Sequence, residues 1–193
     1  LQLAQLPKDV CLTLPDHTPG RVRFVCCSDT HCHHDLLEVP QGDVLIHTGD
    51  LCGNYGESSP ELLAQFRKAL NWLAGLSTRF EAVFVVPGNH DTMLDAKAYN
   101  TSEAQRLIAA LPENCFFLNG EDSPEAGLAM FRGIRIWAAP VVVSRVESLN
   151  KRYVSDAFER THAQRKQVRS FHISLHRARL RHPALPALWR FAP

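Results

Sequence analysis

The chain has 193 residues, of which 45% are hydrophobic and 21% charged, and these values fit one ordinary soluble domain, with room for an attached tail. No apolar run approaches the ~18 residues needed to cross a bilayer, and no signal peptide is recognisable, which argues against a membrane protein. The net charge of +1 hides an asymmetry, because residues 1–143 carry 10 Lys or Arg and 17 Asp or Glu, whereas residues 144–193 carry 11 and 3.

Two short apolar runs rich in β-branched residues come first along the chain. Residues 21–27 and 43–47 each lead directly into a polar cluster, which predicts buried strands with functional loops at their carboxyl ends. A helix is then expected from Ser59, because serine can cap a helix and Pro60 suits its first turn. Apolar residues recur at helical spacing as far as Leu73, so one face of this helix should pack on a sheet.

A third apolar run, residues 82–86, again ends in a polar turn and predicts a third strand. Ser102, with Gln105 three residues later, has the pattern of a capping box and predicts a second helix, which Pro112 would end. Residues 128–131 and 134–138 then predict the two strands of a β-hairpin. Together these elements predict an α/β protein whose ligands bind beyond the carboxyl ends of the strands.

The composition changes after Pro140, where residues 141–143 are followed by an Arg- and His-rich stretch (residues 151–182) with weak periodicity and no clear strand. We therefore divide the chain into an N-terminal extension (residues 1–20), a domain (residues 21–143) and an atypical basic tail (residues 144–193). Basic stretches can bind nucleic acids, but this one has no recognisable nucleic-acid-binding motif, so we do not expect such a partner.

Three polar motifs carry the chemistry, and each follows a predicted strand: Asp29-Thr30-His31, Gly49-Asp50 and Gly88-Asn89-His90-Asp91. Carboxylate, imidazole and amide oxygen suit Mn²⁺, Fe, Zn²⁺ or Mg²⁺, and one central aspartate can bridge two such ions. Two ions about 3.5–4 Å apart can clamp the attacking and leaving oxygens of a displacement at phosphorus. The glycines should let the backbone turn sharply where the metals approach.

The order of these motifs resembles the calcineurin-like metallophosphoesterase superfamily, whose pattern is D-x-H, G-D and G-N-H-[D/E], followed by two later histidine motifs. The motif sequences S-D-T-H, H-T-G-D-L and P-G-N-H-D look most like those of the small metallophosphoesterase-domain-containing subgroup. The resemblance implies a two-sheet β-sandwich flanked by helices, incomplete at its C-terminus. It also implies hydrolysis of a phosphodiester, such as a cyclic nucleotide or another small phosphate ester, by a metal-activated hydroxide.

The resemblance assigns divalent-metal binding to four residues: Asp29, His31, Asp50 and Asn89. Asp50 would bridge two ions, and His90, oriented by Asp91, would stabilise the transition state or protonate the leaving group. The later histidines are His162, His172, His176 and His182, and none follows a glycine as the family pattern requires. The second metal site is therefore expected to be incomplete.

This departure supports an alternative from another class, a catalytically silent binding or scaffold module, or a truncated inactive variant whose C-terminal half was replaced. The intact Asn89-His90-Asp91 sequence favours the enzyme, since a scaffold does not need that combination. No protein partner is predicted.

Several residues near the motifs have simpler interpretations. His33 and His34 extend the first cluster, but as loop histidines they are expected to be exposed to water. His47 lies on a strand and is expected to be a core residue or a support behind the site. Cys32 and Cys52 are interpreted as structural. The six cysteines include no C-x-x-C spacing, which indicates a reducing cytoplasm rather than a secreted disulfide framework.

Overall fold

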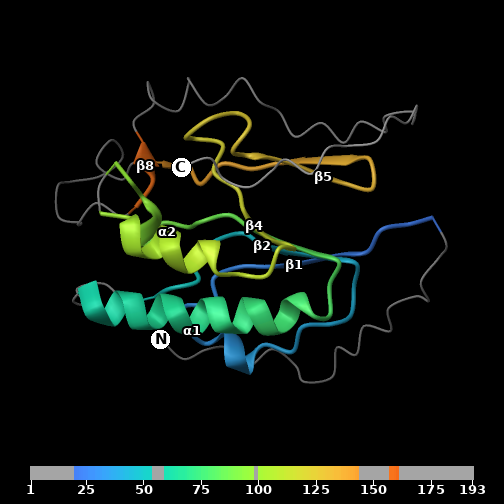
Figure 1. The fold of residues 1–193 in the computed structure, drawn as a ribbon, viewed down its shortest axis with the longest axis horizontal. Helices are drawn as coiled ribbons and strands as arrows, with labels where there is room; N and C mark the ends of the chain where they lie inside the picture. The colour runs from blue at the N-terminus through green and yellow to red at the C-terminus, as the bar shows by residue number, and fades with distance from the viewer. Residues whose placement is uncertain (1–19, 54–58, 98–99, 144–156, 161–193) are drawn as a thin grey trace.

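The computed structural model describes residues 20–53, 59–97, 100–143 and 157–160 (Figure 1). Four strands form a parallel sheet in chain order: β1 (Phe24–Cys27), β2 (Val44–His47), β3 (Ala82–Val85) and β4 (Cys115–Phe117). All four carboxyl ends therefore lie at one edge of the sheet, where the polar motifs follow the first three strands.

The helices form one layer against this sheet. Helix α1 (Ser59–Ser77) connects β2 to β3, and α2 (Ser102–Ala109) connects β3 to β4. Two short 3₁₀ helices, η1 (His34–Leu36) and η2 (Thr92–Leu94), lie in the loops after β1 and β3. Figure 1 shows α1 and α2 on the same side of the sheet. In the described part of the chain, no helix is both long and apolar enough to cross a membrane.

The opposite side of the sheet is covered by an antiparallel hairpin of β5 (Leu128–Phe131) and β6 (Ile134–Trp137) (Figure 1). The two-residue alternation of the strands explains the layers. Leu45 and Val83 face the helices and pack with Phe66 of α1, whereas Val44 and Phe84 face the hairpin. The predicted α/β class and its two sheets are confirmed.

Two local expectations are corrected by the structure. Strand β4 was not predicted, because a three-residue run between a turn and a loop gives almost no periodic signal. The capping box at Ser102 is wrong, since Thr101 is the N-cap residue and no side chain caps it. Instead, the Ser102 amide donates to Oδ1 of Asn100 at 3.1 Å, so the residue two positions earlier satisfies that amide.

Part of the stretch predicted to lack strands is ordered against the domain. Strand β7 (Val142–Val143) pairs in parallel with β8 (Glu159–Arg160), so the expectation of no strand is wrong at residues 159–160. Ala157 and Phe158 are buried in the core on the helix side. Residues 1–19 of the N-terminal extension lie outside the described residues, as does the remainder of the tail with its four histidines. The division at residue 143 stays a prediction.

Candidate metal centre

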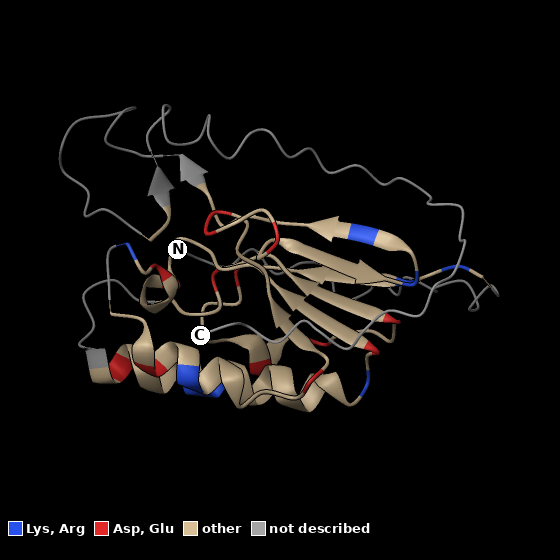
Figure 2. Ribbon diagram, turned by 45° about the horizontal axis from the view of Figure 1, so that its top comes forward, with Lys and Arg blue, Asp and Glu red and all other residues tan. Residues whose placement is uncertain are grey.

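The loops after β1, β2 and β3 are joined by backbone hydrogen bonds. The Asp29 amide donates to the Gly49 carbonyl at 2.9 Å, and the His31 amide donates to the Asp50 carbonyl at 3.0 Å. The Asp50 side chain then reaches the third loop, where its Oδ1 accepts the His90 amide at 2.9 Å. The structure thus brings together the three motifs at the edge where the sequence predicts a site, with acidic residues in these loops (Figure 2).

Two glycines allow the second and third loops to touch. Gly49 has a φ of +104°, and a Cβ there would lie 2.7 Å from the Cα of Gly88. A Cβ on Gly88 would lie 2.1 Å from Oδ1 of Asp50. Any side chain at either position would therefore displace Asp50 or separate the loops.

The backbone at the site is held in an uncommon conformation. Asp29, His31, Cys32 and Asp50 all have positive φ values, of 54°, 41°, 63° and 56°. Non-glycine residues rarely adopt this left-handed region, and those that do tend to cluster at functional sites. The hydrogen bonds between the loops hold these residues in place, so the polar side chains are pre-positioned.

One hydrogen bond determines which nitrogen of His31 is available to a ligand. Nδ1 lies 3.2 Å from the Cys52 carbonyl oxygen, which can only accept, so Nδ1 carries the proton and Nε2 carries the lone pair. Nε2 lies 3.9 Å from Oδ1 of Asp29 and 3.9 Å from Oδ2 of Asp50. A histidine held in this way through its other nitrogen has the orientation of a metal ligand.

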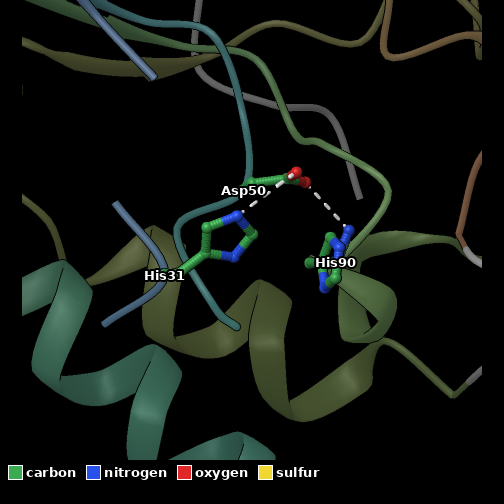
Figure 3. Close-up of side chains that lie close together, drawn as sticks. All are labelled: His31, Asp50 and His90. Atoms are coloured by element: carbon green, nitrogen blue, oxygen red, sulfur yellow. Dashed lines mark hydrogen bonds and ion pairs between the residues drawn. The ribbon is translucent and has the colours of Figure 1, made fainter. Parts of the chain in front are cut away.

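His31, Asp50 and His90 form a cluster that could hold a cation (Figure 3). One ligand atom from each lies within 4.8 Å of the others, and the two imidazole rings meet edge to face with centroids 4.7 Å apart. Metal bonds of about 2.0–2.2 Å place the ligands of one ion roughly 3–4.5 Å apart, so this cluster needs only small side-chain shifts. Two imidazoles and a carboxylate suit a borderline divalent ion.

The other predicted ligands lie around this cluster. The Asp29 side chain is 66% exposed and faces His31, and Asn89 lines the pocket beside Asp50. The cluster includes His90, which the resemblance treats as catalytic, and the assignment of each role remains a prediction.

Asp91 is fully buried and joins the second loop to the third. Its Oδ1 accepts the Cys52 amide at 2.9 Å, and its Oδ2 accepts the Gly88 amide at 2.8 Å. Burial raises the pKa of Asp91 to about 6, although these two amides act in the opposite direction. Asp91 thereby secures the loops that carry Asp50 and His90, while its orientation of the His90 ring stays a prediction.

His47 supports the site from behind, and its prediction as a core residue is confirmed, since it is 0% exposed. Its Nδ1 accepts the Gly49 amide at 3.3 Å, so Nε2 carries the proton and donates to Thr30 Oγ1 at 3.1 Å. Burial lowers the pKa of His47 to about 4, only partly offset by the Asp29 carboxylate. This neutral imidazole ties the first loop to the turn at Gly49.

The two loop histidines have different outcomes. His33 is exposed, as predicted, but the prediction for His34 is wrong, because His34 is only 1% exposed. Its ring packs on Trp72 of α1 with centroids 5.1 Å apart, because η1 lies against that helix. Neither ring nitrogen of His34 has a hydrogen-bond partner, and burial lowers its pKa.

Two cysteines flank the cluster. The Cys32 thiol donates to Oε1 of Gln65 on α1 at 3.2 Å, and Cys52 is 2% exposed, with burial raising the pKa of its thiol. The five cysteines in the described ranges are all free.

A pocket of about 480 Å³ opens beside Asp50. Asp29, Thr48, Asp50 and Asn89 form its polar side, whereas residues 137–141 with Val86 and Pro87 form an apolar side. The described lining includes no Lys or Arg. Sequence reasoning missed Thr48 and the apolar side, because hairpin and sheet meet there only in the folded chain.

A short segment far along the chain fastens the third loop. The Ala157 amide donates to the Asn89 carbonyl at 3.0 Å, and the Phe158 amide donates to Oδ2 of buried Asp95 at 2.7 Å. The side chains of Ala157 and Phe158 are 0% and 1% exposed. The loop that carries Asn89 and His90 therefore depends on residues within the basic stretch, which sequence reasoning also missed.

Comparison with known proteins identifies a family. The model of the calcineurin-like phosphoesterase family matches residues 22–181. Metallophosphoesterase domain-containing protein 1 of Homo sapiens and that of Mus musculus are each 30% identical over 138 residues, covering 63% of this chain and 38% of theirs. UPF0046 protein C25E10.12 of Caenorhabditis elegans is 58% identical over 42 residues, covering 20% of this chain and 15% of that protein. The chain thus spans 38% of the length of the two mammalian relatives.

Proposed function

Since the chain belongs to the calcineurin-like phosphoesterase family, we propose that it hydrolyses a small phosphodiester with divalent metal ions held by its three strand-end loops. The observation that carries this proposal is the cluster of His31, Asp50 and His90, whose ligand atoms lie within 4.8 Å of one another. Asp29 and Asn89 adjoin the same cluster and complete the proposed ligand set.

Each side chain has a part that follows from its contacts. His31 presents Nε2 because the Cys52 carbonyl holds its other nitrogen. Asp50 directs Oδ2 toward His31 and uses Oδ1 to hold the loop after β3 through the His90 amide. A bound divalent ion would polarise a phosphoryl oxygen and lower the pKa of a coordinated water to about 7.

His90 is suited to either of two roles, ligand or proton donor. Its ring lies 4.7 Å from that of His31, close enough to bind the same ion or to protonate an ester oxygen above it. A His90→Gln variant separates the roles. If His90 is a ligand, the variant binds Mn²⁺ more weakly. If His90 is a proton donor, the variant slows the hydrolysis only of diesters whose leaving group needs a proton.

The charges around the pocket favour a diester over a monoester. A phosphomonoester is dianionic at neutral pH, whereas a diester carries a single negative charge. With Asp29 and Asp50 binding the metal ions, the described lining of the pocket has no Lys or Arg to offset the additional charge of a monoester. Its volume of about 480 Å³ suits a small ester or a cyclic nucleotide.

A second candidate function is binding without catalysis. The observation that favours it is that no histidine after Asp91 follows a glycine, which leaves Asp50 and Asn89 as the proposed ligands of a second ion. We also propose a cytoplasmic location, since the sequence has no C-x-x-C spacing and its described cysteines are free.

The deciding experiment is hydrolysis of bis(p-nitrophenyl) phosphate by metal-stripped protein that has been resupplied with Mn²⁺. We expect turnover that Asp50→Asn abolishes, with slower turnover of p-nitrophenyl phosphate, the matching monoester. Circular dichroism must show that the variant is folded. A folded wild-type protein that binds Mn²⁺ but gives no turnover would refute the proposed hydrolytic activity and favour binding without catalysis.

A further inference from the structure

We infer that the pocket beside Asp50 selects diesters in which one ester group is a flat aromatic ring, and that Trp137 is the residue that contacts this ring. The inference rests on the proposed function, because it assigns the phosphoryl group to the polar side of the pocket. It adds the chemical class of the organic group and the residue that recognises it.

The two sides of the pocket differ in chemistry. Asp29, Asp50 and Asn89 lie on the side of the metal centre, where the phosphoryl group would bind. The side formed by residues 137–141 consists of Trp137, two alanines, a proline and a valine. A diester bound with its phosphorus at Asp50 therefore has an apolar surface for one of its two organic groups.

Close packing fixes the position of this apolar side. The Ala138 amide donates to the Gly127 carbonyl at 2.9 Å, and the Ala138 carbonyl accepts the Gly120 amide at 2.9 Å. A Cβ on Gly120 would lie 2.6 Å from Cζ2 of Trp137, so the indole is packed directly against that backbone. Trp137 is consequently held as a preformed surface, and ordering it costs little when a substrate binds.

Ring stacking explains why the selected group should be aromatic. An aromatic ring stacked on an indole gains quadrupole and dispersion interactions that a small alkyl group cannot match. Stacking of this kind typically changes affinity about tenfold or more. An acidic organic group is disfavoured, because the described lining of the pocket contains no Lys or Arg that could pair with it.

The test compares diphenyl phosphate with dimethyl phosphate, two monoanionic diesters with and without aromatic ester groups. We measure the dissociation constants of both ligands by calorimetry with Mn²⁺-loaded wild type, Trp137→Ala and Trp137→Phe. The preference for the diphenyl ligand should fall about tenfold in Trp137→Ala and be largely restored in Trp137→Phe. Because both ligands carry the same charge, comparing the ratios of their affinities isolates the contact with residue 137.

Calorimetric Mn²⁺ binding should be the same in all three proteins, which shows that the metal centre is intact. An unchanged preference for diphenyl phosphate in Trp137→Ala would overturn the inference. Hydrolysis of bis(p-nitrophenyl) phosphate tests the proposed function separately. If no ester is hydrolysed, the proposed function fails, and the inference is still decided by whether Trp137→Ala removes the preference for the diphenyl ligand.

A nucleotide could supply the same flat ring as an aryl ester. A further pair of ligands, adenosine 3′,5′-cyclic phosphate and the ribose cyclic phosphate that lacks the base, distinguishes the two sources. Tighter binding of the base-containing ligand, lost in Trp137→Ala, identifies a nucleobase. Equal binding of this pair, together with a preference for diphenyl phosphate, identifies a simple aryl group.

Discussion

The backbone amide of His90 donates to Oδ1 of Asp50 at 2.9 Å, while Oδ2 of the same carboxylate lies 3.9 Å from Nε2 of His31. One side chain thus positions the third loop with one oxygen and faces the metal centre with the other. Its φ of 56° is one that Asp and Asn adopt more readily than other residues with a Cβ. Mutation can separate the role of Asp50 in the metal centre from its role in holding the third loop.

Asp50→Asn and Asp50→Ala should both lose metal binding but differ in stability. Asn keeps an oxygen for the His90 amide and tolerates the positive φ, so the free energy of unfolding should stay within about 1 kcal/mol of wild type. Ala removes the acceptor and strains the backbone, and should cost a further ~1–2 kcal/mol. Calorimetry with Mn²⁺ should show at least about tenfold weaker binding for both. Wild-type Mn²⁺ affinity in Asp50→Asn would exclude Asp50 as a ligand.

Local sequence patterns predicted the first three strands, both helices and the hairpin, because the strands are short apolar runs bounded by polar residues or a turn and the helices have apolar residues at helical spacing. The convergence of Asp29, Asp50 and His90 followed from the parallel strand order that such patterns imply. The sequence could therefore predict where the candidate site lies and which residue types come together there.

Features that depend on contacts distant in sequence were missed or misjudged. The burial of His34 depends on Trp72 of α1, 38 positions later in the chain. The anchoring of the third loop depends on Phe158, which donates to a side chain 63 positions earlier. Neither contact leaves a periodic signal, since η1 spans three residues and β8 two.

Phe158→Ala should weaken both the fold and metal binding. The side chain is 1% exposed, and truncating a buried phenylalanine typically costs about 3–5 kcal/mol of unfolding free energy. Because the neighbouring Ala157 amide holds the Asn89 carbonyl, Mn²⁺ affinity should fall as well.

Leu36→Ala is the matched control for this prediction. Leu36 is 79% exposed, so its truncation should change neither stability nor Mn²⁺ affinity. If Phe158→Ala does not fold, Phe158→Leu keeps most of the apolar volume and should show a smaller loss of the same kind. Normal stability and Mn²⁺ affinity in folded Phe158→Ala would show that residues 157–158 do not hold the loop.

The buried His47 should make stability depend on pH. Its pKa is lowered to about 4 in the folded protein, against 6.5 for an exposed histidine, so below pH 6.5 protons bind preferentially to the unfolded chain. The stabilisation is complete above pH 6.5 and is lost as the pH falls toward 4. Between pH 7.5 and 5 the loss should be about 2 kcal/mol.

Urea unfolding of wild type and His47→Gln at these two pH values measures this contribution. Asp91 titrates in the opposite sense, because burial raises its pKa to about 6 and its stabilising effect grows as the pH falls. The quantity to compare is therefore the difference in the free energy of unfolding between wild type and His47→Gln. This difference should shrink by about 2 kcal/mol on acidification from pH 7.5 to 5. His33→Gln, at an exposed position, should follow wild type. A constant difference between wild type and His47→Gln would contradict the assigned protonation.

Two histidines that contact the same tryptophan should respond oppositely to the same substitution. His34 and His47 are 1% and 0% exposed, and their rings lie 5.1 Å and 6.0 Å from Trp72. Neither nitrogen of His34 is hydrogen-bonded, whereas those of His47 bond to Gly49 and Thr30. Burying a polar atom without a partner costs about 1–3 kcal/mol, so His34→Phe should raise the free energy of unfolding by ~1–2 kcal/mol.

His47→Phe adds the same volume but leaves the Gly49 amide and the Thr30 hydroxyl without their partner, and should lower the free energy of unfolding by ~2–4 kcal/mol. Because both variants introduce the same ring beside Trp72, the cost of overpacking is similar, and the difference reports hydrogen bonding. Urea unfolding at pH 7.5 measures both changes. Destabilisation by His34→Phe equal to that by His47→Phe would mean that packing rather than polar satisfaction determines stability behind the metal centre. The opposite signs expected here would assign His47 to supporting the Gly49–Asp50 turn and leave His34 a site where stability can be gained.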